Sequence, residues 1–335
     1  MVSPLEYKEK IDDALHQFFD DKAKGKSGIE LEAIEKLRDF TLRGGKRIRP
    51  IFMLMGYWLN GEIDERIINA SVSLELMQSY LLIHDDIIDR SDVRRGGPSF
   101  HRMFGYDPSI NEGLAIVCAD LSDAYSHEIL LEALFPHDRL NSAMKIMAVT
   151  VEMTGIGQLM DITLSLSDKI NEEDVINIHK YKTAQYTING PIKMGATLSG
   201  YQDLGKLDSY GIPLGIAFQI QDDILGMYGD EQQLGKSVLS DFQEGKKTHL
   251  ILYAYELANA KDADFIKQRL GKRISMEEFS IVREIIKKSG ALDKTKDLAE
   301  RYYQMAIASI EHITDDPAKR IELKRMAELM VRRAR

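Results

Sequence analysis

Residues 67–89 read IINASVSLELMQSYLLIHDDIID, inside a run from 63 to 92 that contains neither glycine nor proline. Apolar residues recur in it at the three- and four-residue spacing of a helix, as at Ala70, Leu74 and Met77. A helix that is apolar on most of its faces is buried in a protein core. We therefore predict a central helix whose charged end opens inside the protein, where carboxylates are costly unless a cation compensates them.

The same helical spacing recurs along most of the chain, and the sustained alternation typical of strands is absent. We predict an all-α fold, a single large helical bundle in which residues 1–335 form one domain. We expect Gly190 and Pro191 to kink or break one of its helices. The expected helices are 5–22, 28–43, 48–60, 63–92, 109–135, 138–166, 171–200, 205–229, 247–260, 262–271, 276–289, 292–313 and 317–332.

Composition excludes several classes of function. With 44% apolar and 29% charged residues, the chain has the balance of a folded globular protein. Its net charge of −9 argues against a nucleic-acid-binding protein, which needs a basic surface. Cys118, the single cysteine, cannot form an internal disulfide. No leader peptide is apparent and the apolar stretches are too short to span a membrane, so we expect a cytoplasmic protein without a transmembrane segment.

Two groups of aspartates stand at the ends of apolar segments. Asp85 and Asp89 are four residues apart, so on a helix they share one face, and we expect Asp92 to continue that face. Asp222 and Asp223 end a second apolar segment, FQIQDD. Like charges at helical spacing repel until a cation binds between them, and oxygen ligands with substrate phosphates favour Mg²⁺. The alternative for either group alone is a solvated helix end, which the repetition of the pattern disfavours.

Basic residues gather in three short segments, which are RGGKRIRP at 43–50, DVRRGGP at 92–98 and GKSVLSDFQEGKKT at 235–248. Arginine and lysine at this density suit phosphate oxygens, although each segment alone also fits a solvated loop. GDEQQLGKS is similar to a phosphate-binding P-loop. Its glycines are spaced too widely, however, and it follows a helical pattern, so we exclude a P-loop.

Taken in order, these segments resemble the motifs of the trans-polyprenyl (isoprenyl) diphosphate synthase family. GGKRIRP, DDIIDRSDVRRG, YKTAQYT, FQIQDD and LGKSVLSDFQEGKKT match the family from about residue 40 to 250. The resemblance implies a helical bundle of the isoprenoid synthase type with a central active-site cavity, commonly in a homodimer. It also implies a prenyltransferase that condenses an allylic prenyl diphosphate with isopentenyl diphosphate in a head-to-tail, trans reaction, with Mg²⁺ as cofactor and three ions in the substrate complex.

Residue roles follow from the match to these motifs and are expectations of the resemblance. The implied metal ligands are Asp85, Asp89 and Asp222, with Asp86 and Asp223 as supporting members. The implied ligands of isopentenyl diphosphate are Lys46, Arg49, Gln78 and Arg95. The implied ligands of the allylic diphosphate are Arg94, Lys182, Lys236 and Lys246. Thr183 and Gln219 resemble the polar groups beside the developing carbocation.

The family's chemistry accounts for both signs of charge. Loss of diphosphate from an allylic carbon creates a cation and a highly charged leaving group, so metal ions and lysines must neutralise the developing charge. Isopentenyl diphosphate keeps its diphosphate, which a site of Lys and Arg without metal can anchor. The departing diphosphate is the expected base, so we expect His84 and His101 to have structural roles.

The residues before the first aspartates bear on product length. Tyr80 lies five positions before Asp85, about 7.5 Å along a helix axis, where its ring would block a growing hydrocarbon. Leu81 and Met77 are expected beside it on the cavity floor. The resemblance is closest to short-chain synthases, and we favour geranylgeranyl diphosphate over farnesyl diphosphate as the product. The alternative for Tyr80 is a packing role in the core.

One motif departs from the family pattern. Gly226 stands where many relatives carry a third Asp, which leaves the third metal without an assigned ligand beyond Asp222. The stretch DDILGMYGD approximates a metal motif of class I terpene cyclases, an alternative function, but a cyclase has no use for an isopentenyl diphosphate site. A second alternative is a non-catalytic subunit of a heteromeric synthase, which would be expected to lack the aspartate pairs. The C-terminal VRRAR either covers a bound diphosphate or stays solvated.

Overall fold

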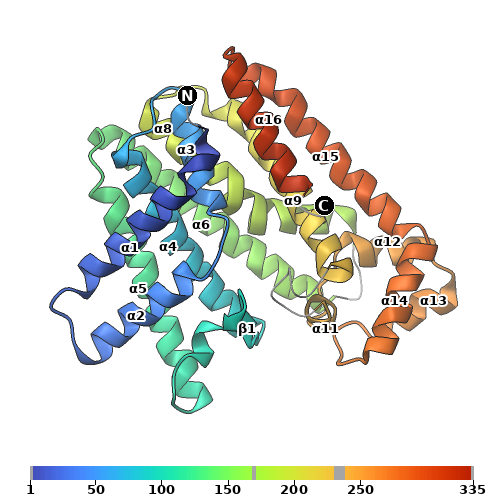
Figure 1. The fold of residues 1–335 in the computed structure, drawn as a ribbon. Coiled ribbons are helices and arrows are strands. Elements are labelled where there is room, and N and C mark those ends of the chain that lie inside the picture. Colours follow the sequence, from blue (N-terminus) through green and yellow to red (C-terminus); the bar gives the residue numbers. More distant parts are fainter. Residues whose placement is uncertain (1–2, 168–170, 230–237, 333–335) are drawn as a thin grey trace. The chain divides into compact units, whose positions relative to one another are not determined.

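The computed structural model describes residues 3–167, 171–229 and 238–332, so Lys236 and most of VRRAR lie outside the described residues. The described chain is helical apart from one short hairpin, which confirms the all-α fold (Figure 1). It divides into two compact units, Met1–Met147 with Pro191–Leu204, and Ala148–Gly190 with Gly205–Arg335, and each is described by itself. That the chain acts as a single domain stays a prediction. None of the described helices is long and apolar enough to cross a bilayer.

The central helix of the first unit is α4 (Glu65–Ile88). It contacts α1 (Lys8–Ala23), α2 (Gly28–Leu42), α3 (Ile48–Trp58) and α5 (Pro108–Leu131) (Figure 1). The buried helix expected around residues 67–89 is therefore confirmed. The unit also contains η1 (Pro4–Tyr7), η2 (Phe100–Arg102), the beginning of α6 (His137–Ser165) and nearly all of α8 (Gly190–Ser199).

Local chemistry sets the two ends of α4. The carboxylate of Asp64 accepts hydrogen bonds from the backbone N–H groups of Arg66 and Ile67, at 3.0 and 3.3 Å, which caps the first turn. The helix ends at Ile88, and Arg90, with φ of 53°, has the left-handed backbone that stops an α-helix. The helix is therefore shorter at both ends than the sequence pattern predicts.

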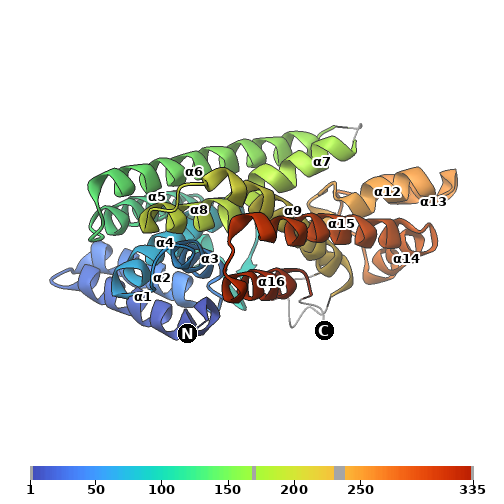
Figure 2. The same cartoon turned by 90° about the horizontal axis from the view of Figure 1, so that it is seen from above.

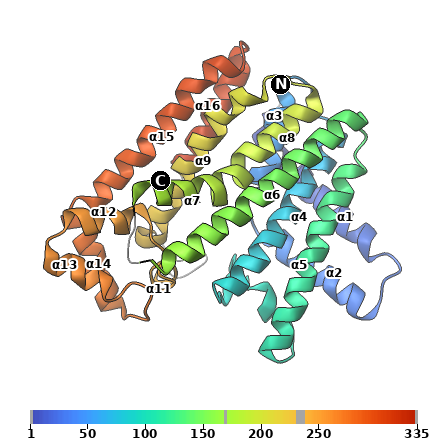
Figure 3. The same ribbon diagram turned by 180° about the vertical axis from the view of Figure 1, so that it is seen from behind.

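Small side chains allow α4 and α5 to lie close together, side by side (Figure 3). Ala115, Ala119 and Ser122 recur at helical spacing on α5, and all three are fully buried. The hydroxyl of Ser122 donates a hydrogen bond to the carbonyl oxygen of Leu76 on α4, at 2.9 Å. This contact fixes α5 against the half of α4 that leads to the aspartates.

A buried ion-pair network ties the loop before α3 to α1 and α4. Arg47 is 2% exposed, and it donates hydrogen bonds to Asp12 Oδ1 and Glu75 Oε2, each at 2.6 Å. It also donates to the carbonyl oxygen of Thr41, at 3.0 Å. Burial opposes the charge of Arg47, but Glu75 and Asp12 outweigh it and raise the pKa of the guanidinium. Arg47, although it belongs to the basic segment RGGKRIRP, therefore serves the fold.

The segment after α4 forms a hairpin that the sequence pattern does not predict. β1 (Val93–Arg94) pairs antiparallel with β2 (Gly97–Pro98), with Arg94 opposite Gly97. The two turn residues, Arg95 and Gly96, have φ of 52° and 72°, as a type I′ hairpin turn requires. Strands of two residues are too short to show an alternating pattern, so they escape a search for periodicity.

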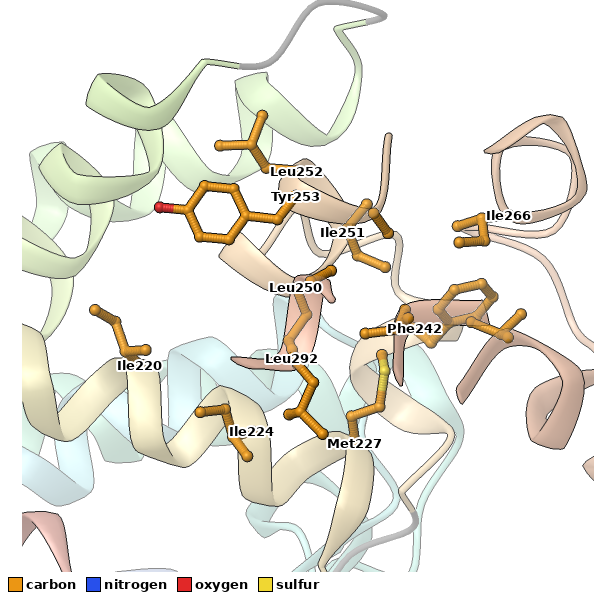
Figure 4. Packing of buried hydrophobic residues seen from close by; sticks show 14 of the residues in the cluster. Ile220, Ile224, Met227, Phe242, Leu250, Ile251, Leu252, Tyr253, Ile266 and Leu292 are labelled. Carbon is orange, nitrogen blue, oxygen red and sulfur yellow. The ribbon is translucent and has the colours of Figure 1, made fainter. Parts of the chain in front are cut away.

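Several helices of the second unit share an apolar core. Ile220, Ile224 and Met227 of α9 meet Leu250 and Leu292 from two other helices in this core (Figure 4). Helices α15 and α16 lie against each other (Figure 2). Besides the rest of α6, the elements are α7 (Glu172–Ile178), η3 (His179–Asn189), α9 (Leu204–Tyr228), α11 (Ser240–Gln243), α12 (His249–Leu257), α13 (Ala260–Lys267), α14 (Met276–Lys288), α15 (Ala291–Ile313) and α16 (Pro317–Val331).

The helix expected over residues 171–200 changes type along its length. It begins as α7, continues as the π-helix η3 and returns to α-helix at Gly190. The N–H of Gly190 donates to the carbonyl oxygen of Gln185, five residues earlier, and this wider turn gives the ring of Pro191 room that an α-helix lacks. The Gly-Pro pair therefore marks a change of helix type and not a break. π-Helical turns are rare in proteins as a whole, and many of those that occur lie at functional sites.

We expect Arg47→Met to lower the free energy of unfolding by about 3–5 kcal/mol, because it leaves the buried Glu75 without its cation. Denaturant unfolding followed by circular dichroism measures this loss. Arg66→Met is the matched control, since Arg66 pairs with Asp64 at 48% exposure and should contribute far less to stability than the buried Arg47. Equal, small losses in both variants would contradict a structural role for Arg47.

Candidate active site

The end of α4 separates the aspartates of the first cluster by burial. Asp86 is fully buried, and Arg94 Nε donates a hydrogen bond to its Oδ1 at 2.8 Å. Asp85 keeps 22% of its side chain exposed, with its Oδ2 at 3.5 Å from Arg94 Nη2. The N–H of Asp89 donates to the carbonyl oxygen of Asp85 at 2.8 Å, so these two partly exposed aspartates lie one turn apart. The arrangement keeps Asp85 and Asp89 accessible, whereas Asp86 holds Arg94 in place.

Asp92 does not continue the face of Asp85 and Asp89, so that expectation is wrong. It lies beyond the end of α4, with 73% of its side chain exposed, and its carboxylate accepts a hydrogen bond from Arg102 Nε at 2.8 Å. The left-handed residue Arg90 turns the chain away before Asp92 is reached. Helical spacing applies only while the helix continues.

The basic loop before α3 meets the hairpin turn. The guanidinium carbon of Arg95 lies 3.7 Å from the position that a Cβ on Gly45 would take. Burial, with the positive charges of Arg49, Arg47 and Arg94, lowers the pKa of Arg95, and Glu75 opposes this effect. Gathered positive charges of this kind are stabilised by an anion.

The other two residues implied for isopentenyl diphosphate belong to the same unit. Lys46 is exposed in the loop next to Gly45. Gln78 is 9% exposed on α4, three residues after Glu75, which places it on the helix face that holds Arg47. The sequence-based group of Lys46, Arg49, Gln78 and Arg95 therefore lies around one loop and one helix face of the first unit.

A hydrogen-bonded chain joins η3 to α9 in the second unit. Thr183 Oγ1 donates to Gln219 Oε1 at 2.8 Å, and Gln219 Nε2 donates to Asp223 Oδ1 at 2.7 Å. His179 Nε2 lies 3.1 Å from Asp223 Oδ2. Sequence analysis selected Thr183, Gln219 and Asp223 but missed His179. Its position, four residues before Thr183 and therefore on the same helix face, was the available signal.

The described lysines implied for the allylic diphosphate are held by carboxylates. Lys182 Nζ donates to Asp161 Oδ2 at 2.6 Å, with both side chains about one-fifth exposed. Lys246 Nζ lies 3.2 Å from Asp241 Oδ1 and 2.7 Å from Glu244 Oε2. Sequence analysis did not single out these three acidic partners, although Asp241 and Glu244 lie within the quoted motif GKSVLSDFQEGKKT. Asp161 lies outside the quoted motifs.

A small pocket brings several of these residues together. Asp223, Gly226, Asp241, Lys246 and Thr248 are among the residues that line it. A Cβ on Gly226 would lie 2.6 Å from Asp241 Oδ2, closer than real Cβ contacts. The side-chain space where the family's third Asp would begin is therefore taken by the carboxylate of Asp241, which comes from α11.

The residues implied for product length lie on α4 near α5. The ring of Tyr80 is half-buried and packs edge-on against the His84 imidazole, with centroids 4.9 Å apart. Burial, followed by the charges of Asp123 and Asp120 on α5, raises the pKa of Tyr80. In the same stretch of α4, Met77 is fully buried and Leu81 is partly exposed.

We expect Gly226→Ala to destabilise the protein by roughly 1–3 kcal/mol, since the added methyl group displaces Asp241 from its contact with Lys246. Thermal unfolding measures the effect. Gly205→Ala is the matched control, because it lies on the same helix with open space around its Cβ position, and it should be neutral or slightly stabilising. An unchanged melting temperature for Gly226→Ala would show that the Asp241 carboxylate moves aside without a loss of stability.

Comparison with known proteins adds an independent observation. The family model of polyprenyl synthetases matches residues 32–288. A geranylgeranyl diphosphate synthase of Sulfolobus acidocaldarius is 36% identical over 298 residues, which cover 87% of each chain. A geranylfarnesyl diphosphate synthase of Aeropyrum pernix is 31% identical over 295 residues, covering 86% of this chain and 89% of the relative.

A solved structure is also closely similar. It is the geranylgeranyl pyrophosphate synthase of Corynebacterium glutamicum, complexed with isoprenyl diphosphate and magnesium. It superimposes with a TM-score of 0.93 at 29% identity, covering 99% of this chain and 100% of that chain. The motifs, the helical fold and these similarities agree, and the chain belongs to the polyprenyl synthetase family.

Proposed function

We propose that this family member is a short-chain prenyltransferase that condenses an allylic diphosphate with isopentenyl diphosphate, with geranylgeranyl diphosphate as the favoured product. One observation carries the proposal. Arg94 contacts Asp85 and Asp86, and the next residue, Arg95, lies over Gly45 of the basic loop. An acidic site and a basic site are therefore neighbours in the first unit. The reaction needs two such sites, one that activates a diphosphate as a leaving group and one that only anchors it.

The donor set at the end of α4 fits a divalent metal. Asp85 and Asp89 offer carboxylate oxygens one turn apart, and both are partly exposed. Among the described residues, no three or more His, Cys, Asp or Glu side chains form a metal-binding group. Mg²⁺ commonly uses one or two carboxylates together with waters and substrate phosphates. We propose Mg²⁺ here, where a bound ion would neutralise charge on the leaving diphosphate. On the family resemblance, we also propose three ions in the substrate complex and Asp222 as a further metal ligand.

The remaining polar residues divide between the two substrates. Lys46, Arg49, Gln78 and Arg95 would anchor isopentenyl diphosphate through its phosphate oxygens. Lys182 and Lys246 would bind the allylic diphosphate, exchanging the carboxylates of Asp161 and Asp241 for phosphate oxygens. Arg94 and Lys236 are proposed for the same role. No protein nucleophile is required, because the isopentenyl double bond attacks the allylic cation and the released diphosphate takes the proton.

The proposed assembly is a homodimer. In the first unit, α5 exposes Ile116, Val117 and Leu121, and in the second unit α6 exposes Ile156 and Leu159, the last at 65%. Large apolar side chains grouped on a helix surface are typical of protein interfaces. The relatives' family commonly forms dimers, and these surfaces support the same for this chain. The cytoplasm is proposed as its compartment on sequence grounds alone.

Asp85→Asn tests the function directly. The purified chain with radiolabelled isopentenyl diphosphate, geranyl or farnesyl diphosphate and Mg²⁺ should yield a labelled linear prenyl diphosphate. The variant should lower kcat by roughly 10²- to 10³-fold, the loss typical of removing one group that stabilises developing charge. Asp92→Asn is the matched control, because its carboxylate is 73% exposed and pairs with Arg102, away from Asp85. A cyclic hydrocarbon formed without isopentenyl diphosphate would instead indicate a terpene cyclase, and an inactive wild-type chain a non-catalytic subunit.

Tyr80→Ala tests the product length. We expect longer products, because removing the ring lets the hydrocarbon extend further along α4. Chromatography of the dephosphorylated products measures the distribution, and Tyr80→Phe, which keeps the ring, should retain the wild-type length. If the alanine variant also keeps the wild-type distribution, Tyr80 serves packing alone.

A further inference from the structure

The polar side chains of His179, Thr183, Gln219 and Asp223 form a connected series, with two of them on η3 and two on α9. His179 and Thr183 lie four residues apart on η3, and Gln219 and Asp223 lie four residues apart on α9. All four side chains belong to the second unit. His179 is 5% exposed and Asp223 11% exposed, so water competes little for their contact.

The direction of each hydrogen bond follows from chemistry. An ionised carboxylate only accepts hydrogen bonds, so the amide nitrogen of Gln219, and not its carbonyl oxygen, must face Asp223. The carbonyl oxygen of Gln219 then faces Thr183 and takes the single hydroxyl proton of that residue. The lone pairs on Thr183 Oγ1 remain for another partner, and they suit a positive charge.

His179 holds the other side of the carboxylate. Its Nε2 lies 3.1 Å from Asp223 Oδ2, while Gln219 Nε2 donates a hydrogen bond to Oδ1. Oδ2 has no hydrogen-bond partner among the described residues, so the imidazole restrains it by a close polar contact. Rotation of the carboxylate would lose both the Gln219 hydrogen bond and this contact. Without His179, Asp223 has one restraint fewer, and the Gln219 amide can turn its N–H groups towards Thr183.

A second imidazole supports the ring of His179. His249 packs against it with centroids 5.1 Å apart and planes tilted by 59°. Burial, with the positive charges of His179 and Lys294, lowers the pKa of His249 to about 2, so this ring stays neutral. Neither of its nitrogens has a hydrogen-bond partner among the described residues. His249 therefore acts on His179 by packing alone.

We propose that His179 is a positioning residue for prenyl transfer. It fixes Asp223, and through Gln219 it keeps the lone pairs of Thr183 turned towards the allylic cation as that cation forms. The inference rests on the proposed function, in which Thr183 and Gln219 stand beside this cation. It adds a residue that touches neither substrate and acts only through the carboxylate of Asp223.

The test compares two replacements of His179. His179→Phe keeps the ring volume and removes the polar contact with Asp223, and we expect kcat to fall about 10- to 100-fold, as when a supporting polar partner behind an active-site group is removed. The KM for isopentenyl diphosphate should not change, since its proposed ligands are elsewhere. His179→Gln places an amide N–H near the Nε2 position and should recover most of the rate. His249→Phe is the packing control and should stay within about twofold of wild type.

A double-mutant cycle separates positioning from general damage. If His179 acts through Gln219, then His179→Phe should have little further effect on kcat in a Gln219→Leu background. Multiplicative losses in the double variant, or a wild-type kcat for His179→Phe, would overturn the proposal. A wild-type chain without isopentenyl-dependent turnover would instead overturn the proposed function.

One further measurement does not depend on turnover. Nitrogen-15 spectra of the histidine rings should show the proton of His179 on Nε2 in the wild-type protein. The Nε2 signal should shift in Asp223→Asn. It should shift much less in Lys180→Ala, a substitution next to His179 on η3 that leaves the contacts among His179, Asp223, Gln219 and Thr183 unchanged. A proton on Nδ1, with Nε2 unprotonated, would place a lone pair of His179 against the Asp223 carboxylate and would overturn the proposal.

Discussion

The ion pair between Arg94 and the buried carboxylate of Asp86 is the contact on which the first unit's site depends. A fully buried carboxylate is strongly unfavourable without a hydrogen-bonded cation, so this pair holds the hairpin against the end of α4. Arg95 follows directly and is thereby set over Gly45. One interaction therefore keeps an acidic helix end and a basic loop side by side, although their charges would suit different ligands.

In the second unit, contacts among buried polar side chains likewise hold the candidate residues in place. Its Thr183, Gln219 and Asp223 side chains are joined by two hydrogen bonds, and the acceptor-only carboxylate of Asp223 sets the direction of both. His179 Nε2 lies 3.1 Å from the other oxygen of that carboxylate. Lys182 and Lys246 are held by carboxylates in turn. Such pairs keep each cation extended and oriented, so an incoming diphosphate exchanges one set of oxygens for another and little side-chain ordering is needed.

Two features of the first unit follow from the local sequence pattern alone. The apolar run before Asp85 had to be a buried helix, and the four-residue spacing to Asp89 had to place two carboxylates together while that helix lasted. Spacing failed at Asp92, because the left-handed residue Arg90 redirects the chain. It also failed to separate Arg47 from its basic neighbours, since only folding brings Asp12 and Glu75 to that guanidinium.

Periodicity and motif order thus decided the helical class, the family resemblance and most of the candidate residues, because these depend on neighbours within a few positions. Packing over long separations decided the rest. Because of long-range packing, Arg47 is the arginine of its segment that pairs with the buried Glu75. The same packing places the Asp241 carboxylate beside Gly226 and brings His179 within 3.1 Å of Asp223, 44 residues later in the sequence. Burial and partner choice are properties of the folded chain, since the free energy of a charge is set by the groups that surround it.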